Sequence, residues 1–172
     1  MANKLITVGA DGRLSFRGRR YRCALGRAGI VADKREGDGA TPAGEFPLRR
    51  LLYRPDRLPE PATGLEVLPI GPDDGWCDAP EDAAYNRPVR LPHPASAERL
   101  WREDRLYDLV VVLGHNDDPP RPGLGSAIFL HVARPDYGPT EGCVALAPDD
   151  LLEVLAAADA ASAIRIAQAG GG

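Results

Sequence analysis

One stretch of the chain, residues 126–146, constrains the fold more than any other. An apolar run ends at His131, a loop with two prolines and a glycine follows, and a corner of small residues leads to Cys143 and a second apolar segment. The chain between the two side chains is mostly loop. We therefore expect two strands whose ends meet at one edge of a sheet and bring the imidazole and the thiol together.

This pair of residue types suits nucleophilic catalysis. The thiolate is the reactive form of cysteine, and a neighbouring imidazole can accept the thiol proton and return it to a leaving group. Gly142 permits tight backbone curvature, and the backbone N–H groups of Gly142 and Cys143 are candidates for stabilising an oxyanion. The alternative is that Cys143 is a buried structural residue, because cysteine often packs as a small apolar side chain.

Three segments carry a resemblance to a known family. Residues 140–144, Thr-Glu-Gly-Cys-Val, resemble the Ser/Thr-x-Gly-Cys-Ile/Val signature of YkuD-type L,D-transpeptidases. Residues 128–131, Ile-Phe-Leu-His, are similar to the strand that carries their general base, and residues 39–46 resemble their Thr-Pro-x-Gly-x-Phe turn. The segments occur in the family's order, and the resemblance spans most of the chain.

The resemblance implies a β-sandwich-like catalytic domain that transfers acyl groups on peptidoglycan stem peptides through a cysteine thioester. It implies that Cys143 is the nucleophile, His131 the general base and acid, and Gly142 a backbone oxyanion donor. Thr140 is expected to orient the loop or the histidine. Arg134 is expected either to pair with a substrate carboxylate or to be a solvated loop residue.

The sequence departs from the family pattern in three ways. Glu141 stands where many members have a second histidine, Ala145 stands where many have Arg or Asn, and the loop from His131 to Cys143 is shorter than usual. We expect Glu141 to point away from the sulfur, because an adjacent carboxylate raises the pKa of a thiol. Two other functions remain open: a hydrolase that uses the same residues, and a non-enzymatic cell-wall binding module.

Three more residues are candidates for the site. His115 follows an apolar strand, as His131 does, so it is a candidate base, supporting residue, substrate contact or structural residue. Trp76 and Tyr85 lie among turn residues. Packing against the sheet is the favoured interpretation for both, while the family resemblance favours an aromatic-lined substrate groove.

The composition is that of a globular protein with many turns. The chain of 172 residues is 44% hydrophobic and 27% charged, with a net charge of −4 and no long block of one sign, so nucleic-acid binding is not indicated. Its 19 glycines and 17 prolines favour many short strands, and we expect a mainly β fold with one or two short helices. We expect a single domain over residues 1–169 and a flexible tail over residues 170–172.

Neither a metal site nor a cofactor is expected. Cys23, Cys77 and Cys143 are too few and too scattered for a disulfide framework or a zinc set, so Cys23 and Cys77 are expected to be unpaired. His93, between two prolines, is expected to be an exposed turn residue. No signal peptide or membrane-spanning run is visible, whereas the family usually acts in the cell envelope, so the compartment stays open.

The remaining expectations concern secondary structure. The Asp11–Gly12 pair predicts a hairpin between strands at residues 5–9 and 13–17. Helices are expected over residues 95–103 and from residue 147 onward. Lys34–Glu36 is expected to be a solvated turn, and residues 49–66 an exposed, Pro-rich excursion. Further strands are expected at residues 21–26, 44–48, 65–70, 107–114 and 163–167.

Overall fold

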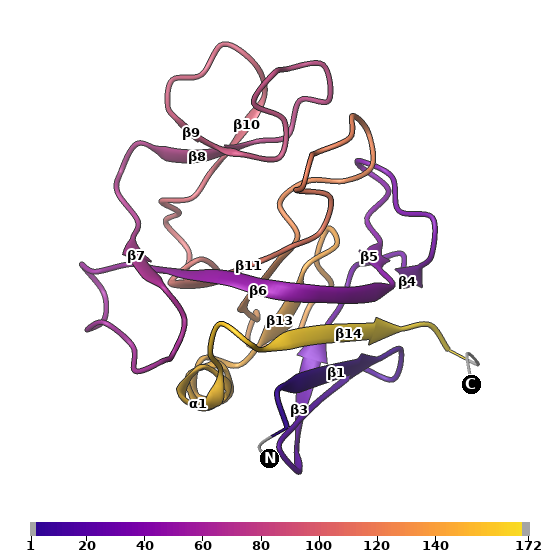
Figure 1. Cartoon of the computed structure of the whole chain (residues 1–172). Helices are drawn as coiled ribbons and strands as arrows, with labels where there is room; N and C mark the ends of the chain where they lie inside the picture. The colour runs from indigo at the N-terminus through magenta and orange to yellow at the C-terminus, as the bar shows by residue number, and fades with distance from the viewer. Residues whose placement is uncertain (1–2, 170–172) are drawn as a thin grey trace.

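Strand β6 (Gly44–Tyr53) crosses the centre of the protein and connects the two parts of its main sheet (Figure 1). In this computed structural model, which describes residues 3–169, the first half of β6 pairs with β14 (Ala163–Ala167) and the second half with β11 (Leu109–Leu113). From β11 the sheet continues through β12 (Phe129–Val132), β13 (Val144–Leu146), β3 (Arg19–Ala24), β2 (Arg13–Phe16) and β1 (Leu5–Gly9), back to β14. The main sheet therefore closes on itself.

The closed sheet has an interior face and an exterior face because side chains alternate along each strand. In β11 all five residues are buried. Leu109, Val111 and Leu113 belong to the interior core, whereas Val110 and Val112 belong to a second apolar cluster outside the sheet. This strand is central, as its β-branched sequence predicts, and the mainly β fold class is confirmed.

Helix α1 (Pro148–Ala157) is the one helix of residues 3–169 and packs on the interior core. Pro148 occupies the first turn, where its missing N–H costs nothing, and acidic residues favour the positive end of the helix dipole. Leu151, Val154 and Leu155 are buried. The prediction of a helix from residue 147 is confirmed.

A small antiparallel sheet lies over the exterior face of the main sheet, at the top of Figure 1. It consists of β8 (Asp74–Cys77), β9 (Pro88–Arg90) and β10 (Ala97–Arg99). The helix expected over residues 95–103 is wrong, because residues 97–99 pair with residues 75–77 of β8. Pairing with a distant segment overrides the local helical pattern.

Of the remaining strands, β7 (Val67–Pro69) pairs in parallel with β6 in the main sheet, and β4 (Ile30–Val31) pairs with β5 (Thr41–Pro42). The expectation of an exposed excursion over residues 49–66 is wrong in part, because its first residues belong to β6. Arg54 is also only 3% exposed: it binds the Asp56 carboxylate and stacks 3.6 Å from the ring centroid of Trp101.

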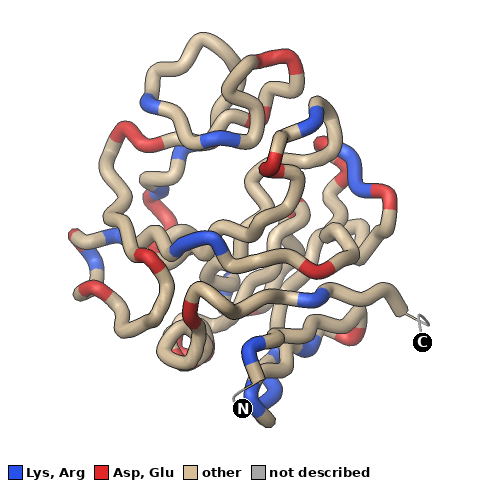
Figure 2. Tube along the Cα trace, viewed as in Figure 1, with Lys and Arg blue, Asp and Glu red and all other residues tan. Residues whose placement is uncertain are grey.

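The predicted hairpin is confirmed. Residues 7–9 of β1 pair with residues 13–15 of β2, and Gly12 adopts φ 76°, a left-handed conformation that favours glycine. Acidic and basic positions are interspersed along the trace, while several Arg gather around β2 and β3 (Figure 2). No helix formed by residues 3–169 has the length and apolarity needed to cross a membrane.

Candidate active site

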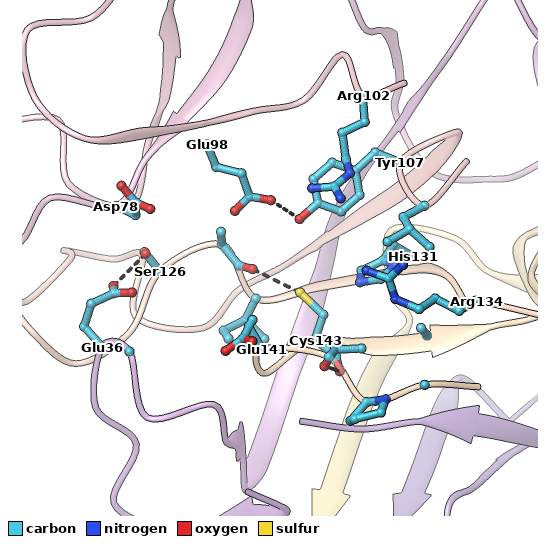
Figure 3. Close-up of a pocket in the computed structure, with 18 of the residues that line it drawn as sticks. Glu36, Asp78, Glu98, Arg102, Tyr107, Ser126, His131, Arg134, Glu141 and Cys143 are labelled. Atoms are coloured by element: carbon cyan, nitrogen blue, oxygen red, sulfur yellow. Dashed lines mark hydrogen bonds between the residues drawn. The ribbon is translucent and has the colours of Figure 1, made fainter. Parts of the chain in front are cut away.

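Adjacent parallel strands bring Cys143 and His131 into one pocket. Strands β12 and β13 pair in parallel with His131 opposite Ala145, and Cys143 immediately precedes β13. Both side chains line a cavity of about 440 Å³ on the exterior face of the main sheet, beneath the small sheet (Figure 3). The two side chains thus share a pocket on one face of the sheet. The expected meeting of two strand ends is wrong, because in this parallel pair Cys143 lies level with the start of β12 and His131 lies further along the strand.

Two backbone groups hold the thiol of Cys143. Its Sγ donates to the carbonyl oxygen of Ala127 at 3.2 Å and accepts the N–H of Phe129 at 3.3 Å. Cys143 is 8% exposed, and this burial raises the pKa of its thiol to about 12, with a further contribution from the negative charge of Glu98. The Phe129 N–H and the charge of Lys34 act in the opposite direction.

The imidazole of His131 is fixed by a backbone carbonyl. Its Nδ1 lies 2.9 Å from the carbonyl oxygen of Val132, which can only accept, so the hydrogen bond assigns the proton to Nδ1 and leaves Nε2 as the basic atom. Tyr107 packs against the ring with a centroid distance of 5.3 Å. Burial lowers the pKa of His131 to about 4, so the imidazole is neutral at pH 7.

Both members of the pair are therefore neutral at rest. Among the described residues the thiol of Cys143 donates to a carbonyl and not to the imidazole. Hydrogen bonds between catalytic groups are often formed only once substrate is bound. The thiol and the imidazole therefore do not form a thiolate–imidazolium pair in this structure.

The turn before Cys143 depends on Thr140 and Gly142. The hydroxyl of Thr140 donates to the carbonyl of Cys143 at 2.6 Å and accepts the N–H of Gly142 at 3.1 Å. Gly142 has φ 142°, and a Cβ there would lie 2.7 Å from the carbonyl oxygen of Ala40, so only glycine fits. Because the Gly142 N–H already binds Thr140, the Cys143 N–H is the better placed candidate for an oxyanion donor.

The wall of the pocket opposite the thiol comes from the small sheet and the segment that follows it. Glu98 in β10 accepts a hydrogen bond from the hydroxyl of Tyr107, and Arg102 lies over the Tyr107 ring at 5.1 Å. Burial raises the pKa of Glu98. Asp78, directly after β8, also lines the pocket, and its buried Oδ1 has no hydrogen-bond partner among the described residues. The sequence does not predict that these residues line the site, because the strand pairing that positions them is non-local.

The expectation of a solvated turn at Lys34–Glu36 is wrong in part, because Arg35 is exposed but Lys34 and Glu36 contribute to the site. Lys34 is 8% exposed, forms an ion pair with Asp38 at 2.5 Å and lines the pocket. Glu36 accepts hydrogen bonds from Tyr85 at 2.7 Å and from Ser126 at 2.6 Å. The glycines at 37 and 39 fold this segment back over the site, which their spacing in the sequence did not reveal.

The structure separates the other predicted site residues. Arg134 and Glu141 line the pocket and are exposed; the Glu141 carboxylate accepts a hydrogen bond from Arg27 at 3.1 Å. His115 is not among the residues that line this pocket. Its ring packs edge-on against Phe46 with a centroid distance of 5.2 Å, and its buried Nδ1 has no partner within residues 3–169.

Trp76 and Tyr85 are buried, at 5% and 3% exposure, so they support the site from behind. Trp76 packs edge-on against Phe129, and the Tyr85 hydroxyl accepts the N–H of Gly125 at 3.0 Å. This agrees with the favoured packing interpretation. Neither side chain lines the pocket that contains Cys143.

Asn86 connects these supporting segments. Its Oδ1 accepts hydrogen bonds from Trp76 Nε1 at 2.9 Å and from the N–H of Ala127 at 3.0 Å. Its Nδ2 donates to the carbonyls of His115 and Asn116. Ala127 itself has φ 53°, a conformation that alanine rarely adopts, and its carbonyl is the one that binds the thiol. Asn86 thus helps to fix the backbone that holds Cys143.

All three cysteines are free, as expected for Cys23 and Cys77.

Fold and site together define a mainly β protein that carries a buried cysteine and a neutral histidine in one polar pocket. The chain belongs to the YkuD family, the L,D-transpeptidase catalytic domain, whose family model matches residues 2–166.

Comparison with solved structures gives weak overall similarity over nearly the whole chain. An LD-transpeptidase in complex with imipenem is 12% identical with a TM-score of 0.45, covering 95% of this chain and 58% of its own. An L,D-transpeptidase from Mycobacterium smegmatis is 14% identical with a TM-score of 0.44 and the same coverage of both chains. L,D-transpeptidase 1 of Mycobacterium tuberculosis is 11% identical with a TM-score of 0.43, covering 94% and 57%.

The chain thus spans just over half the length of these structures. No curated protein matches the chain in sequence.

Proposed function

We propose that the protein is an L,D-transpeptidase that acts on peptidoglycan stem peptides through a thioester on Cys143. The observation that carries this proposal is the shared pocket of Cys143 and His131, in which the basic Nε2 of the imidazole is left free by the Nδ1 hydrogen bond. Membership of the YkuD family supports it.

The first step is acylation. The Cys143 sulfur attacks the carbonyl carbon of the L,D peptide bond, and His131 Nε2 accepts the thiol proton. The Cys143 N–H, with Gly142 as a second donor if it leaves Thr140, stabilises the oxyanion. The C–N bond then breaks, the terminal D-amino acid leaves with the proton returned by His131, and the remaining acyl group stays on sulfur.

The second step releases the enzyme. The amine of a second stem peptide attacks the thioester, its proton passes to His131, and the carbon–sulfur bond breaks to regenerate the thiol. The product is a crosslinked peptide. If water attacks in place of the amine, the same residues give an L,D-carboxypeptidase.

The charges of the pocket suit a peptide that carries both carboxylates and amines. Lys34, Arg102 and Arg134 supply positive charge, while Asp78 and Glu98 supply acidic groups. Asp78 lines the pocket, and its carboxylate is the group that we expect to bind a substrate ammonium group. Arg134, exposed at the rim, is placed to bind a substrate carboxylate.

Product analysis tests the proposal. A stem tetrapeptide is incubated with the protein, with and without a second peptide that offers a free amine, and the products are identified by mass spectrometry. Transpeptidation predicts a crosslinked dimer and release of one D-amino acid. A tripeptide formed equally in both mixtures would indicate a hydrolase, and an unchanged tetrapeptide would indicate a binding module.

A further inference from the structure

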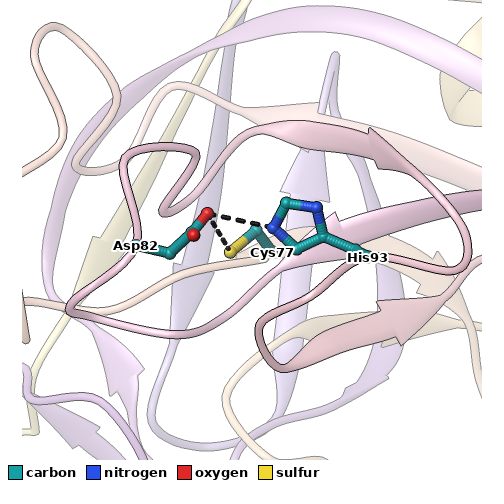
Figure 4. Close-up of side chains that lie close together, drawn as sticks. All are labelled: Cys77, Asp82 and His93. Atoms are coloured by element: carbon teal, nitrogen blue, oxygen red, sulfur yellow. Dashed lines mark hydrogen bonds and ion pairs between the residues drawn. The ribbon is translucent and has the colours of Figure 1, made fainter.

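Outside the pocket, the small sheet gathers three side chains of the kinds that bind metal ions. Cys77 ends β8, Asp82 lies in the turn that follows, and His93 lies in the connection between β9 and β10 (Figure 4). The expectation that His93 is an exposed turn residue is wrong, because its side chain is 16% exposed and contacts Asp82. Sequence spacing does not predict the cluster, since turns and a strand separate its members.

The distances between the donor atoms are close to those of a tetrahedral metal site. Asp82 Oδ2 lies 3.5 Å from Cys77 Sγ and 3.0 Å from His93 Nε2, and the three donor atoms lie within 4.8 Å of one another. Zinc bond lengths of 2.0–2.3 Å and tetrahedral angles give donor separations of about 3.3–3.6 Å. Small side-chain movements therefore suffice to place all three donors around one ion.

The surrounding backbone holds the three residues in place. Cys77 is fully buried and its N–H donates to the carbonyl of Arg87 at 2.9 Å. The N–H of Asp82 donates to the carbonyl of Ala79 at 3.0 Å. His93 stands between two prolines, whose fixed φ angles restrict its backbone. The Asp82 and His93 side chains are 23% and 16% exposed, which leaves a route for an ion from solvent.

We propose that Cys77, Asp82 and His93 form a binding site for a zinc-type divalent cation, with a water molecule as the fourth ligand. Thiolate and imidazole donors select zinc-type ions over magnesium or calcium, which prefer oxygen. Both the Cys77 S–H and the His93 Nε2–H point at the acceptor-only Asp82 carboxylate. On binding, the thiol loses its proton to solvent and the imidazole exchanges its Nε2 proton for one on Nδ1, so that the sulfur, Nε2 and the carboxylate oxygen can each bond the ion.

The site is separate from the pocket that contains Cys143, yet the two share the small sheet. Cys77 pairs with Ala97, the neighbour of Glu98, and directly precedes Asp78. Glu98 and Asp78 line the pocket, whereas the three proposed ligands do not. A bound ion would join the three segments of this sheet and so stabilise the layer that covers the pocket.

Cobalt titration of the full, tag-free chain tests the proposal. Co²⁺ in a tetrahedral site with a thiolate gives a charge-transfer band in the near ultraviolet and strong visible bands. We expect one Co²⁺ per chain, displaced by Zn²⁺, with affinity lowered about 10-fold or more in Cys77→Ser, Asp82→Asn and His93→Gln. Cys23→Ser and Cys143→Ser, which alter the other two buried thiols, are expected to bind as the wild type does.

Thermal unfolding provides a second readout that does not depend on spectra. Zn²⁺ is expected to raise the Tm of the wild type and of Cys143→Ser, and to leave the Tm of His93→Gln unchanged. Circular dichroism without metal checks that each variant is folded. Absence of a thiolate band in the wild type would overturn the proposal, as would a band that survives Cys77→Ser and disappears in Cys143→Ser.

Discussion

The Cys143 thiol donates to the carbonyl oxygen of Ala127, a residue in the left-handed conformation, at 3.2 Å. Its second contact, the N–H of Phe129, also belongs to the backbone. The position of the sulfur is therefore set by the main chain, and neighbouring side chains act mainly on its reactivity. Variants of those side chains are expected to change the pKa of the thiol without displacing it.

Glu98 and Lys34 are expected to act on this thiol in opposite directions. The charge of Glu98 raises the pKa of Cys143 and the charge of Lys34 lowers it. Glu98→Gln should therefore increase the rate of iodoacetamide alkylation at pH 9 about 3-fold or more, and Lys34→Gln should decrease it. Glu141→Gln is the matched control, because Glu141 is exposed and engaged with Arg27. Equal rates in all three variants would refute the electrostatic explanation.

Thr140 is expected to position the turn through its hydroxyl alone. Thr140→Ser keeps the hydrogen bonds to the Cys143 carbonyl and the Gly142 N–H, whereas Thr140→Ala removes both. Because small displacements of reacting groups are costly, acylation by substrate should slow about 10- to 100-fold in the alanine variant and stay near wild type in the serine variant. Similar acylation rates in the two variants would show that the Thr140 hydroxyl does not position the turn.

Asn86 is expected to be important for stability. In Asn86→Asp the carboxylate replaces the Nδ2 donor and faces the carbonyls of His115 and Asn116. Urea denaturation should show a loss of about 3 kcal/mol in the free energy of unfolding, since buried carbonyls lose their partner. Gln168→Ala, at an exposed position, should change it by less than about 0.5 kcal/mol. A loss below about 1 kcal/mol in Asn86→Asp would contradict this role.

His131 is expected to make stability depend on pH. Burial lowers its pKa from 6.5 to about 4 in the folded protein. Between these values the unfolded chain binds a proton that the folded chain does not, so the stabilisation is complete above pH 6.5 and is lost as the pH falls. At pH 4.5 the loss should be about 2.5 kcal/mol.

His131→Gln isolates this contribution, because all other titrating groups are shared with the wild type. The free energy of unfolding, measured in urea at pH 7 and pH 4.5, should fall less in the variant, by the amount that the histidine contributes. The same lowered pKa predicts that the acid limb of kcat/KM lies near pH 4. Equal falls in both proteins, with an acid limb near pH 6.5, would show that the imidazole is not buried in this way.

The sequence predicts those parts of the fold that depend on neighbours in the chain. The β1–β2 hairpin follows from Asp11–Gly12, helix α1 from Pro148 and its acidic first turn, and the shared pocket of His131 and Cys143 from two apolar segments joined by a loop. Local turn chemistry sets the hairpin and capping chemistry sets the helix, whereas the shared pocket also requires the parallel pairing of β12 with β13.

The sequence does not predict what depends on pairing between distant segments. Residues 97–99 have a helical pattern, yet they form a strand because β8 offers its edge, and this places Glu98 in the pocket. Lys34 is charged and lies in a glycine-rich segment, so its burial follows only from the fold of that segment over the site. The cluster of Cys77, Asp82 and His93 arises in the same way.

The central claim is that the Cys143 sulfur becomes acylated with help from His131. Intact-mass spectrometry after exposure to a carbapenem tests it most directly, because ring opening by the thiol adds the whole inhibitor to the protein. We predict one added inhibitor per chain, located on the peptide that contains Cys143, formed more slowly in His131→Gln and absent in Cys143→Ala. An unmodified wild type, or an adduct that persists in Cys143→Ala, would contradict the account.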